Sequence, residues 1–229
     1  MTSIVWPILY VPHYMAQYMT HILWPIIYDP HYMAHTMMTI YIDNEMTTLI
    51  KSLLRLINYV NQRRRDPYLG PEDLFNLEVN IFFDNVFDSH TSEGENATKK
   101  PDWLPAGFKK WETLNQWVRS FGRIFGECLI ESGQKKVLEE GKTILTPYGG
   151  RLEYDIEGIQ FLIHLKHAER VQKGKRWSMV MYLYYLIGFK IDQCEMTCHG
   201  DAVSKDNSFV LALDGDVDFE PEAVELGEF

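Results

Sequence analysis

The sequence predicts an α/β fold with a mostly parallel sheet, on the strength of three features. Residues 78–83 (EVNIFF) and 209–214 (FVLALD) are apolar runs typical of strands. Residues 108–138 lie between these runs and carry apolar side chains at helical spacing. The second run passes directly into carboxylates, which is typical of strand ends at ligand sites in open α/β sheets. Strands that alternate with helices favour a parallel sheet, in which we expect residues 209–213 to form a central strand.

Composition limits the functions that fit the chain. Its 229 residues are 46% hydrophobic and 24% charged, which indicates a globular domain with a substantial core. A net charge of −10 argues against nucleic-acid binding, because a phosphate backbone requires a basic surface. The most apolar segment, residues 177–189, is shorter than the roughly 20 residues of a membrane-spanning helix, so no span is expected.

A duplicated segment occupies the N-terminus. Residues 6–19 (WPILYVPHYMAQYM) recur as residues 24–37 (WPIIYDPHYMAHTM). Each copy is rich in Trp, Ile and Tyr, which suits a strand. We expect residues 1–33 to be a peripheral segment and residues 34–229 to form the main domain. In this interpretation the second copy supplies the first strand, because it leads directly into a predicted helix.

The other expected elements follow from local patterns. Apolar residues at i, i+3, i+4 spacing predict a helix over residues 43–57, capped by Asp43 or Asn44 and ending near the basic run 62–65. Polar, Pro-interrupted residues predict a loop or insertion at 88–107. Two strand-like runs flank Glu157-Gly158, a turn signal, and a further helix is expected at residues 177–189.

The acidic motif DGDVD follows the second apolar run and contains Asp214, Asp216 and Asp218. Asp214 and Asp216, separated by one glycine, can reach a single divalent ion, and Mg²⁺ takes one or two carboxylates together with phosphate oxygens. Two other interpretations stay open. An EF-hand loop would use the same aspartates but requires Gly where Phe219 stands. A solvated acidic turn would bind nothing.

Several ordered segments resemble the insect and nematode type of chitin synthase. They are TPYGGRL (146–152), the stretch from FLIHLKH to KRW (161–177), WSMVMYLYYLIGF (177–189) and FVLALDGDVDFEPEAV (209–224). NEMTTLIKSLLRL (44–56) and EVNIFFDNVF (78–87) match less closely. The resemblance covers roughly residues 34–225 and is loose over 89–141.

The resemblance implies a Rossmann-like domain of a processive, inverting nucleotide-diphospho-sugar transferase. Such enzymes lie in the plasma membrane with this region in the cytosol, and they transfer N-acetylglucosamine from UDP-N-acetylglucosamine to a growing β-1,4 chitin chain. It further implies that Mg²⁺ or Mn²⁺ is held by Asp214 and Asp216. The nucleotide-binding residues it implies are Lys166, Asp214, Tyr148, Gly149 and Arg151.

The sequence departs from the family at two places. Thr39, Ile40 and Tyr41 stand where the family carries a Trp-His-Glu segment whose Glu faces the uridine. The family's general base belongs to a later segment, expected beyond Phe229, so the chain alone is expected to bind donor without transferring sugar. The alternatives are an inactive UDP-binding module, a non-functional truncated product, or another processive transferase such as a hyaluronan or cellulose synthase.

Overall fold

The structure is a computed structural model, and it describes ten parts of the chain. These are residues 3–10, 30–70, 75–84, 86–87, 100–105, 107–108, 113–172, 174–188, 208–214 and 218–226. Within these parts the α/β fold class predicted from the sequence is confirmed. None of the described helices combines the length and apolar character needed to cross a membrane.

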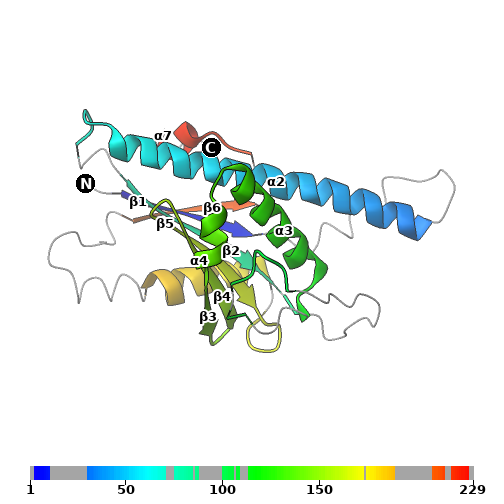
Figure 1. Ribbon diagram of the computed structural model, residues 1–229. Helices are drawn as coiled ribbons and strands as arrows, with labels where there is room; N and C mark the ends of the chain where they lie inside the picture. Colours follow the sequence, from blue (N-terminus) through cyan, green and yellow to red (C-terminus); the bar gives the residue numbers. More distant parts are fainter. Residues whose placement is uncertain are drawn as a thin grey trace.

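A six-stranded mixed sheet forms the centre of the described fold (Figure 1). Its strands are β1 (Ser3–Tyr10), β2 (Phe75–Phe83), β3 (Lys142–Thr146), β4 (Gly149–Ile156), β5 (Ile159–Lys166) and β6 (Ser208–Asp214), in the order β3-β4-β5-β2-β1-β6. The strands β5, β2, β1 and β6 are parallel, whereas β4 pairs antiparallel with β3 and β5. The four parallel strands therefore end at one common edge.

Helices cover both faces of this sheet. The described helices are α2 (Pro30–Arg65), α3 (Gln116–Glu131), α4 (Lys135–Glu140), α5 (Lys175–Met181), the π-helix η4 (Tyr182–Ile187) and α7 (Pro221–Leu226). Successive side chains of a strand point to opposite faces, so Phe82 and Phe83 lie on opposite faces of the sheet. Phe82 contacts Tyr182 of η4, whereas Phe83 contacts Phe121 of α3. Figure 1 shows α2 and α3 together on one side, where their contacts with each other and with β2 place them.

The core on the α2–α3 face is made by the apolar positions predicted to be helical. In α2 these include Leu49, Ile50, Leu53 and Ile57, all with no exposed surface. The aromatic stripe of the 108–138 region is also core, since Phe121 and Phe125 of α3 are buried. This region forms two helices, because the chain turns at Gly133, whose φ of +78° favours glycine.

Helix α2 begins earlier than the sequence predicts. It starts at Pro30, and proline suits the first helical position because its missing N–H would have no partner there. The prediction that Asp43 caps the helix is wrong, since Asp43 lies inside α2 and its carboxylate pairs with Arg123 of α3 at 2.5 Å. The predicted basic end is confirmed, with Arg63, Arg64 and Arg65 in the last turn.

The prediction that the first repeat copy is peripheral is wrong for its strand portion. The strand β1 contains WPILY of the first copy and lies between β2 and β6. The second copy contributes Pro30–Met37 to α2 instead. A continuous apolar run suits a parallel strand buried on both faces, and this property is shared by the two copies, so composition could not choose between them.

Two further predictions concern β6 and the hairpin. Residues 209–214 form a strand as predicted, but the central position expected for this strand is wrong, because β6 lies at the end of the described sheet. The hairpin around Glu157-Gly158 is confirmed as β4 and β5, with φ values of +53° and +82° at the two turn residues. Positive φ at both positions is the geometry of a type I′ hairpin turn.

Candidate functional site at the carboxyl edge of the sheet

The ends of the parallel strands form one row across the sheet. Asp214 pairs with Tyr10, Tyr10 with Phe82, and Phe82 with His164. Three strand spacings separate the ends of the row, so the backbones of Asp214 and His164 lie about 14 Å apart. Lys166 follows two residues after His164, and it is therefore separated from Asp214 by β1 and β2. A ligand that reaches both residues must extend along this edge.

A buried ion pair joins the ends of β2 and β5 to α5. Lys166 Nζ donates to Asp84 Oδ1 and, at 2.7 Å, to Ser178 Oγ of α5. The other carboxylate oxygen, Asp84 Oδ2, accepts from the backbone N–H of Gly174 at 3.0 Å. The side chains of Lys166 and Asp84 are only 1% and 6% exposed. The Lys166 ammonium thus holds three segments together at the predicted edge.

A chain of buried hydrogen bonds connects Tyr148 to the middle of the sheet. Asn80 Nδ2 donates to Glu78 Oε1, which leaves Asn80 Oδ1 to accept from His164 Nε2 at 2.9 Å. In the tautomer with a proton on Nε2, His164 accepts a hydrogen bond at Nδ1 from the Tyr148 hydroxyl, at 2.6 Å. Burial raises the pKa of Tyr148 above its ordinary value, which keeps this hydroxyl protonated as a donor.

Gly149 and Arg151, which belong to the same TPYGGRL segment as Tyr148, have structural roles at this edge. Gly149 has φ of +146°, and a Cβ atom there would lie 2.2 Å from the carbonyl oxygen of Leu165. Only glycine allows this approach between β4 and β5. Arg151 Nε donates to Glu153 Oε1 at 2.8 Å, in a pair whose side chains are about one-fifth exposed (22% and 21%).

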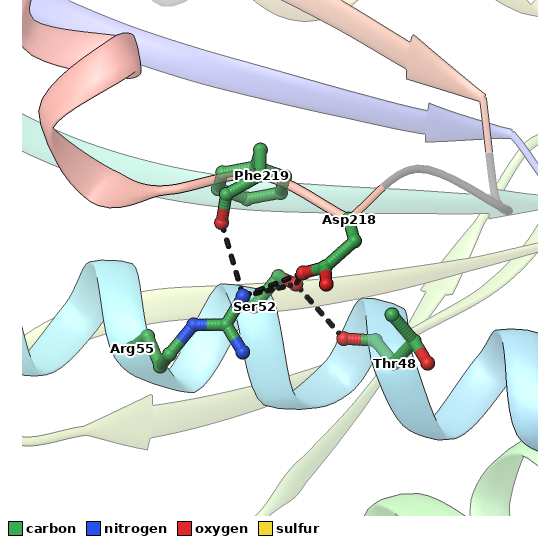
Figure 2. Close-up of polar contacts among 5 residues, drawn as sticks. All are labelled: Thr48, Ser52, Arg55, Asp218 and Phe219. Carbon is green, nitrogen blue, oxygen red and sulfur yellow. Dashed lines mark hydrogen bonds and ion pairs between the residues drawn. The ribbon is translucent and has the colours of Figure 1, made fainter.

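On the opposite face, Asp218 is held by α2 (Figure 2). Its Oδ1 accepts from Ser52 Oγ at 2.6 Å and from Arg55 Nη2 at 2.5 Å. Arg55 Nη2 also donates to the carbonyl oxygen of Phe219 at 3.1 Å. The hydrogen bond from Ser52, followed by the interaction with Arg55, lowers the pKa of the Asp218 carboxyl below its ordinary value.

The two predicted metal ligands are only partly described. Asp214 is the last residue of β6, and only its backbone is described. Asp216 lies outside the described residues. Among the residues whose placement is described, no group of three or more His, Cys, Asp or Glu side chains could hold a metal ion. The donor set itself fits a hard cation, because carboxylate oxygens are the ligands that Mg²⁺ and Mn²⁺ prefer. Thr39, Ile40 and Tyr41 lie within α2.

Sequence reasoning missed Asp84 and Ser178 as members of this edge. Asp84 follows the apolar run of β2 in the same way that Asp214 ends β6, so the rule that selected Asp214 could have selected Asp84 as well. No local signal marks Ser178, which becomes relevant only because α5 packs beside the end of β5 and brings its hydroxyl to Lys166.

Comparison with known proteins gives a consistent result. The chain is 32% identical to chitin synthase chs-1 of Caenorhabditis elegans over 183 residues, which is 80% of this chain and 13% of that protein. It is 33% identical to chitin synthase chs-2 of C. elegans and 32% identical to a chitin synthase of Meloidogyne artiellia, again over 80% of this chain. The chain spans only 9–13% of the length of these curated relatives.

No protein-family model matches the chain. No solved structure matches it either.

An α/β fold whose mixed sheet gathers polar residues at the carboxyl ends of its parallel strands is consistent with a domain of the glycosyltransferase class. The sequence relationship narrows this class, because the matches extend over four-fifths of the chain. The chain belongs to the chitin synthase family and corresponds to one part of these proteins.

Proposed function

We propose that this chain is the donor-binding part of a chitin synthase. It would bind UDP-N-acetylglucosamine, whose N-acetylglucosamine the complete enzyme would transfer to a growing chitin chain. The observation that carries the proposal is the row of strand ends from Asp214 through Tyr10 and Phe82 to His164. In open α/β sheets, ligands bind outside the carboxyl ends of the strands.

The proposed ligand suits the shape of this row. A nucleoside diphosphate sugar is an extended molecule, and the row offers an acidic end at β6 and a cationic group, Lys166, near the end of β5. We propose that the diphosphate lies toward Asp214. The uridine would then lie toward β2 and β5, near Tyr148, Gly149 and Arg151.

A divalent ion is part of the proposal. Asp214 and Asp216 would hold Mg²⁺ or Mn²⁺, which would neutralise the negative charge of the departing diphosphate. The charge of Lys166 is already partly compensated by Asp84, so its proposed contribution to nucleotide binding is smaller than that of the two aspartates. Removal of Lys166 should therefore weaken UDP binding without abolishing it.

Calorimetric titration of the chain with UDP, in Mg²⁺ and in EDTA, tests the proposal. We expect weak binding that depends on the divalent ion, and loss of this dependence in Asp216→Asn. Asp155→Asn is the matched control, because Asp155 lies at the opposite end of the β4–β5 hairpin and its carboxylate accepts from Gly158 N–H. Equal affinity in Mg²⁺ and EDTA would contradict the proposed role of the aspartates.

A further inference from the structure

The third aspartate of the acidic motif is engaged with α2. Asp218 Oδ1 accepts from Ser52 and Arg55, and the nearby carbonyl oxygen of Phe219 accepts from the same Arg55 nitrogen. A carboxylate with a guanidinium at 2.5 Å is poorly placed to bind a metal ion as well, because the two cations would repel each other. The contacts with α2 therefore argue against Asp218 as a third metal ligand.

The Ser52 hydroxyl has two possible acceptors. It lies 2.6 Å from Asp218 Oδ1 and 2.9 Å from the carbonyl oxygen of Thr48, one turn earlier in α2 (Figure 2). A hydroxyl has one proton to donate, and the charged acceptor at the shorter distance makes the stronger bond. Ser52 has no exposed surface, so Asp218 reaches the buried side of α2.

The acidic segment is attached at each side. Upstream, Asp214 is fixed in β6, paired with Tyr10 of β1. Downstream, Phe219 and Val224 are buried in the core, and α7 packs on α2. These apolar contacts hold the downstream chain against α2. The polar contacts of Asp218 add a fixed orientation at the residue that directly follows the segment 215–217.

We infer that Ser52 and Arg55 are positioning residues for the metal-binding segment. By holding Asp218 and the Phe219 carbonyl, they fix the chain at the residue that directly follows segment 215–217, and this anchor would keep Asp214 and Asp216 in place relative to the bound cation. This inference rests on the proposed function and deepens it. In this inference Asp218 anchors the segment, and Asp214 and Asp216 bind the cation.

The direction in which Arg55→Gln changes the Mn²⁺ affinity distinguishes positioning from a simple effect of charge. Arg55→Gln removes a positive charge near the acidic motif, and charge alone would then make Mn²⁺ bind more tightly. Release of Asp218 as a metal ligand would have the same effect. Loss of positioning weakens Mn²⁺ binding instead, by about 10-fold if it resembles the removal of other residues that orient metal ligands.

The experiment uses the full chain in four forms: wild type, Arg55→Gln, Ser52→Ala and Lys51→Gln. Lys51 is the charge-matched control, since it carries the same charge, is exposed and directly precedes Ser52 in α2. Mn²⁺ affinity is measured by the electron paramagnetic resonance signal of the free ion. Hydrogen–deuterium exchange is measured in peptides that cover residues 209–219, and thermal unfolding confirms that each form is folded.

We expect Arg55→Gln and Ser52→Ala to lose exchange protection around residue 218 and to bind Mn²⁺ more weakly, whereas Lys51→Gln should match the wild type. Tighter Mn²⁺ binding in Arg55→Gln, or unchanged exchange in both variants, would overturn the inference. Absence of Mn²⁺ binding in the wild type would contradict the proposed function instead. In that case the exchange measurement still decides whether Ser52 and Arg55 anchor the segment.

Discussion

The two faces of the sheet hold the ends of its strands by different kinds of ion pair. On the α5 face, Lys166 and Asp84 are 1% and 6% exposed and share their hydrogen bonds with Ser178 and Gly174. On the α2 face, the side chains of Arg55 and Asp218 are 43% and 60% exposed. The first pair is part of the protein interior, whereas the second lies at the surface beside a buried serine.

Because the two ion pairs differ in burial, we expect them to contribute differently to the stability of the fold. Removal of one partner of a buried pair leaves a charge without compensation in a medium of low dielectric, which strongly destabilises the fold. An exposed pair contributes little to stability because water screens it. We therefore expect substitutions on the α5 face to act on folding, and substitutions on the α2 face to act on the geometry of the site.

The largest effect is expected from Lys166→Ala. This substitution leaves the Asp84 carboxylate buried without its cation, and the free energy of unfolding should fall by about 3–5 kcal/mol. Denaturation by urea measures the loss. The control is Lys136→Ala, which breaks the exposed pair with Glu140 in α4 and should cost about 0.5 kcal/mol or less.

A double substitution sharpens this prediction. Asp84→Asn combined with Lys166→Met removes the two charges together, so no unpaired charge remains, and it should recover much of the stability lost in Lys166→Ala. A double variant as unstable as the single one would mean that packing of the Lys166 chain, and not its charge, stabilises this edge.

Gly149→Ala tests the approach of β4 to β5 beside the same pair. A non-glycine residue at φ of +146° is strained by about 1–3 kcal/mol, and the added Cβ would also meet Leu165 O at 2.2 Å. Gly133→Ala is the control for a positive φ without a close contact, since Gly133 has φ of +78° with no heavy atom within 4 Å of the added Cβ. If the two variants unfold at the same temperature, the close approach of the added Cβ to Leu165 O does not contribute to the loss of stability.

His164→Leu should have a somewhat smaller effect. It leaves Asn80 Oδ1 and the Tyr148 hydroxyl without their partner, and a buried polar group left in this way costs about 1–3 kcal/mol. His164→Gln keeps an amide that can bond to one neighbour, so it should be less destabilising. Equal stability of His164→Leu and wild type would show that the hydrogen-bond chain contributes nothing to folding.

The smallest effect on stability is expected from Arg55→Gln. Its pair with Asp218 is exposed, and Phe219 and Val224 continue to anchor the downstream chain in the core. The melting temperature, measured by circular dichroism, should match that of wild type within error. A fall comparable to that of Lys166→Ala would break the distinction between the two faces.

Local patterns in the sequence were sufficient for much of this description. Apolar runs predicted β2 and β6, the spacing of Leu49, Ile50 and Leu53 predicted part of α2, and Glu157-Gly158 predicted the hairpin turn. The position of Asp214 at the end of a strand followed from the same patterns. These features depend on residues that are close together in the chain, where side-chain periodicity carries the information.

The partners of the site residues could not be predicted in this way. Arg55 lies 163 residues before Asp218, and Asp84 lies 82 residues before Lys166. Such pairs form only when the order of the strands brings their ends together, and no local pattern encodes that order. The repeat shows the same limit, because WPILY and WPIIY are equally good strands and only the assembled sheet shows that the first one forms β1.

The position of the bound cation on the sheet can be located directly. In the NMR spectrum of the ¹⁵N-labelled chain with UDP, substoichiometric Mn²⁺ broadens the amide signals nearest to it. If the cation lies at the carboxyl end of β6, the signals of Leu213, Asp214 and Asp218 should disappear first, while those of the β3–β4 hairpin remain. Broadening centred on that hairpin, or spread evenly over the acidic surface, would contradict the assignment of the site to the carboxyl end of β6.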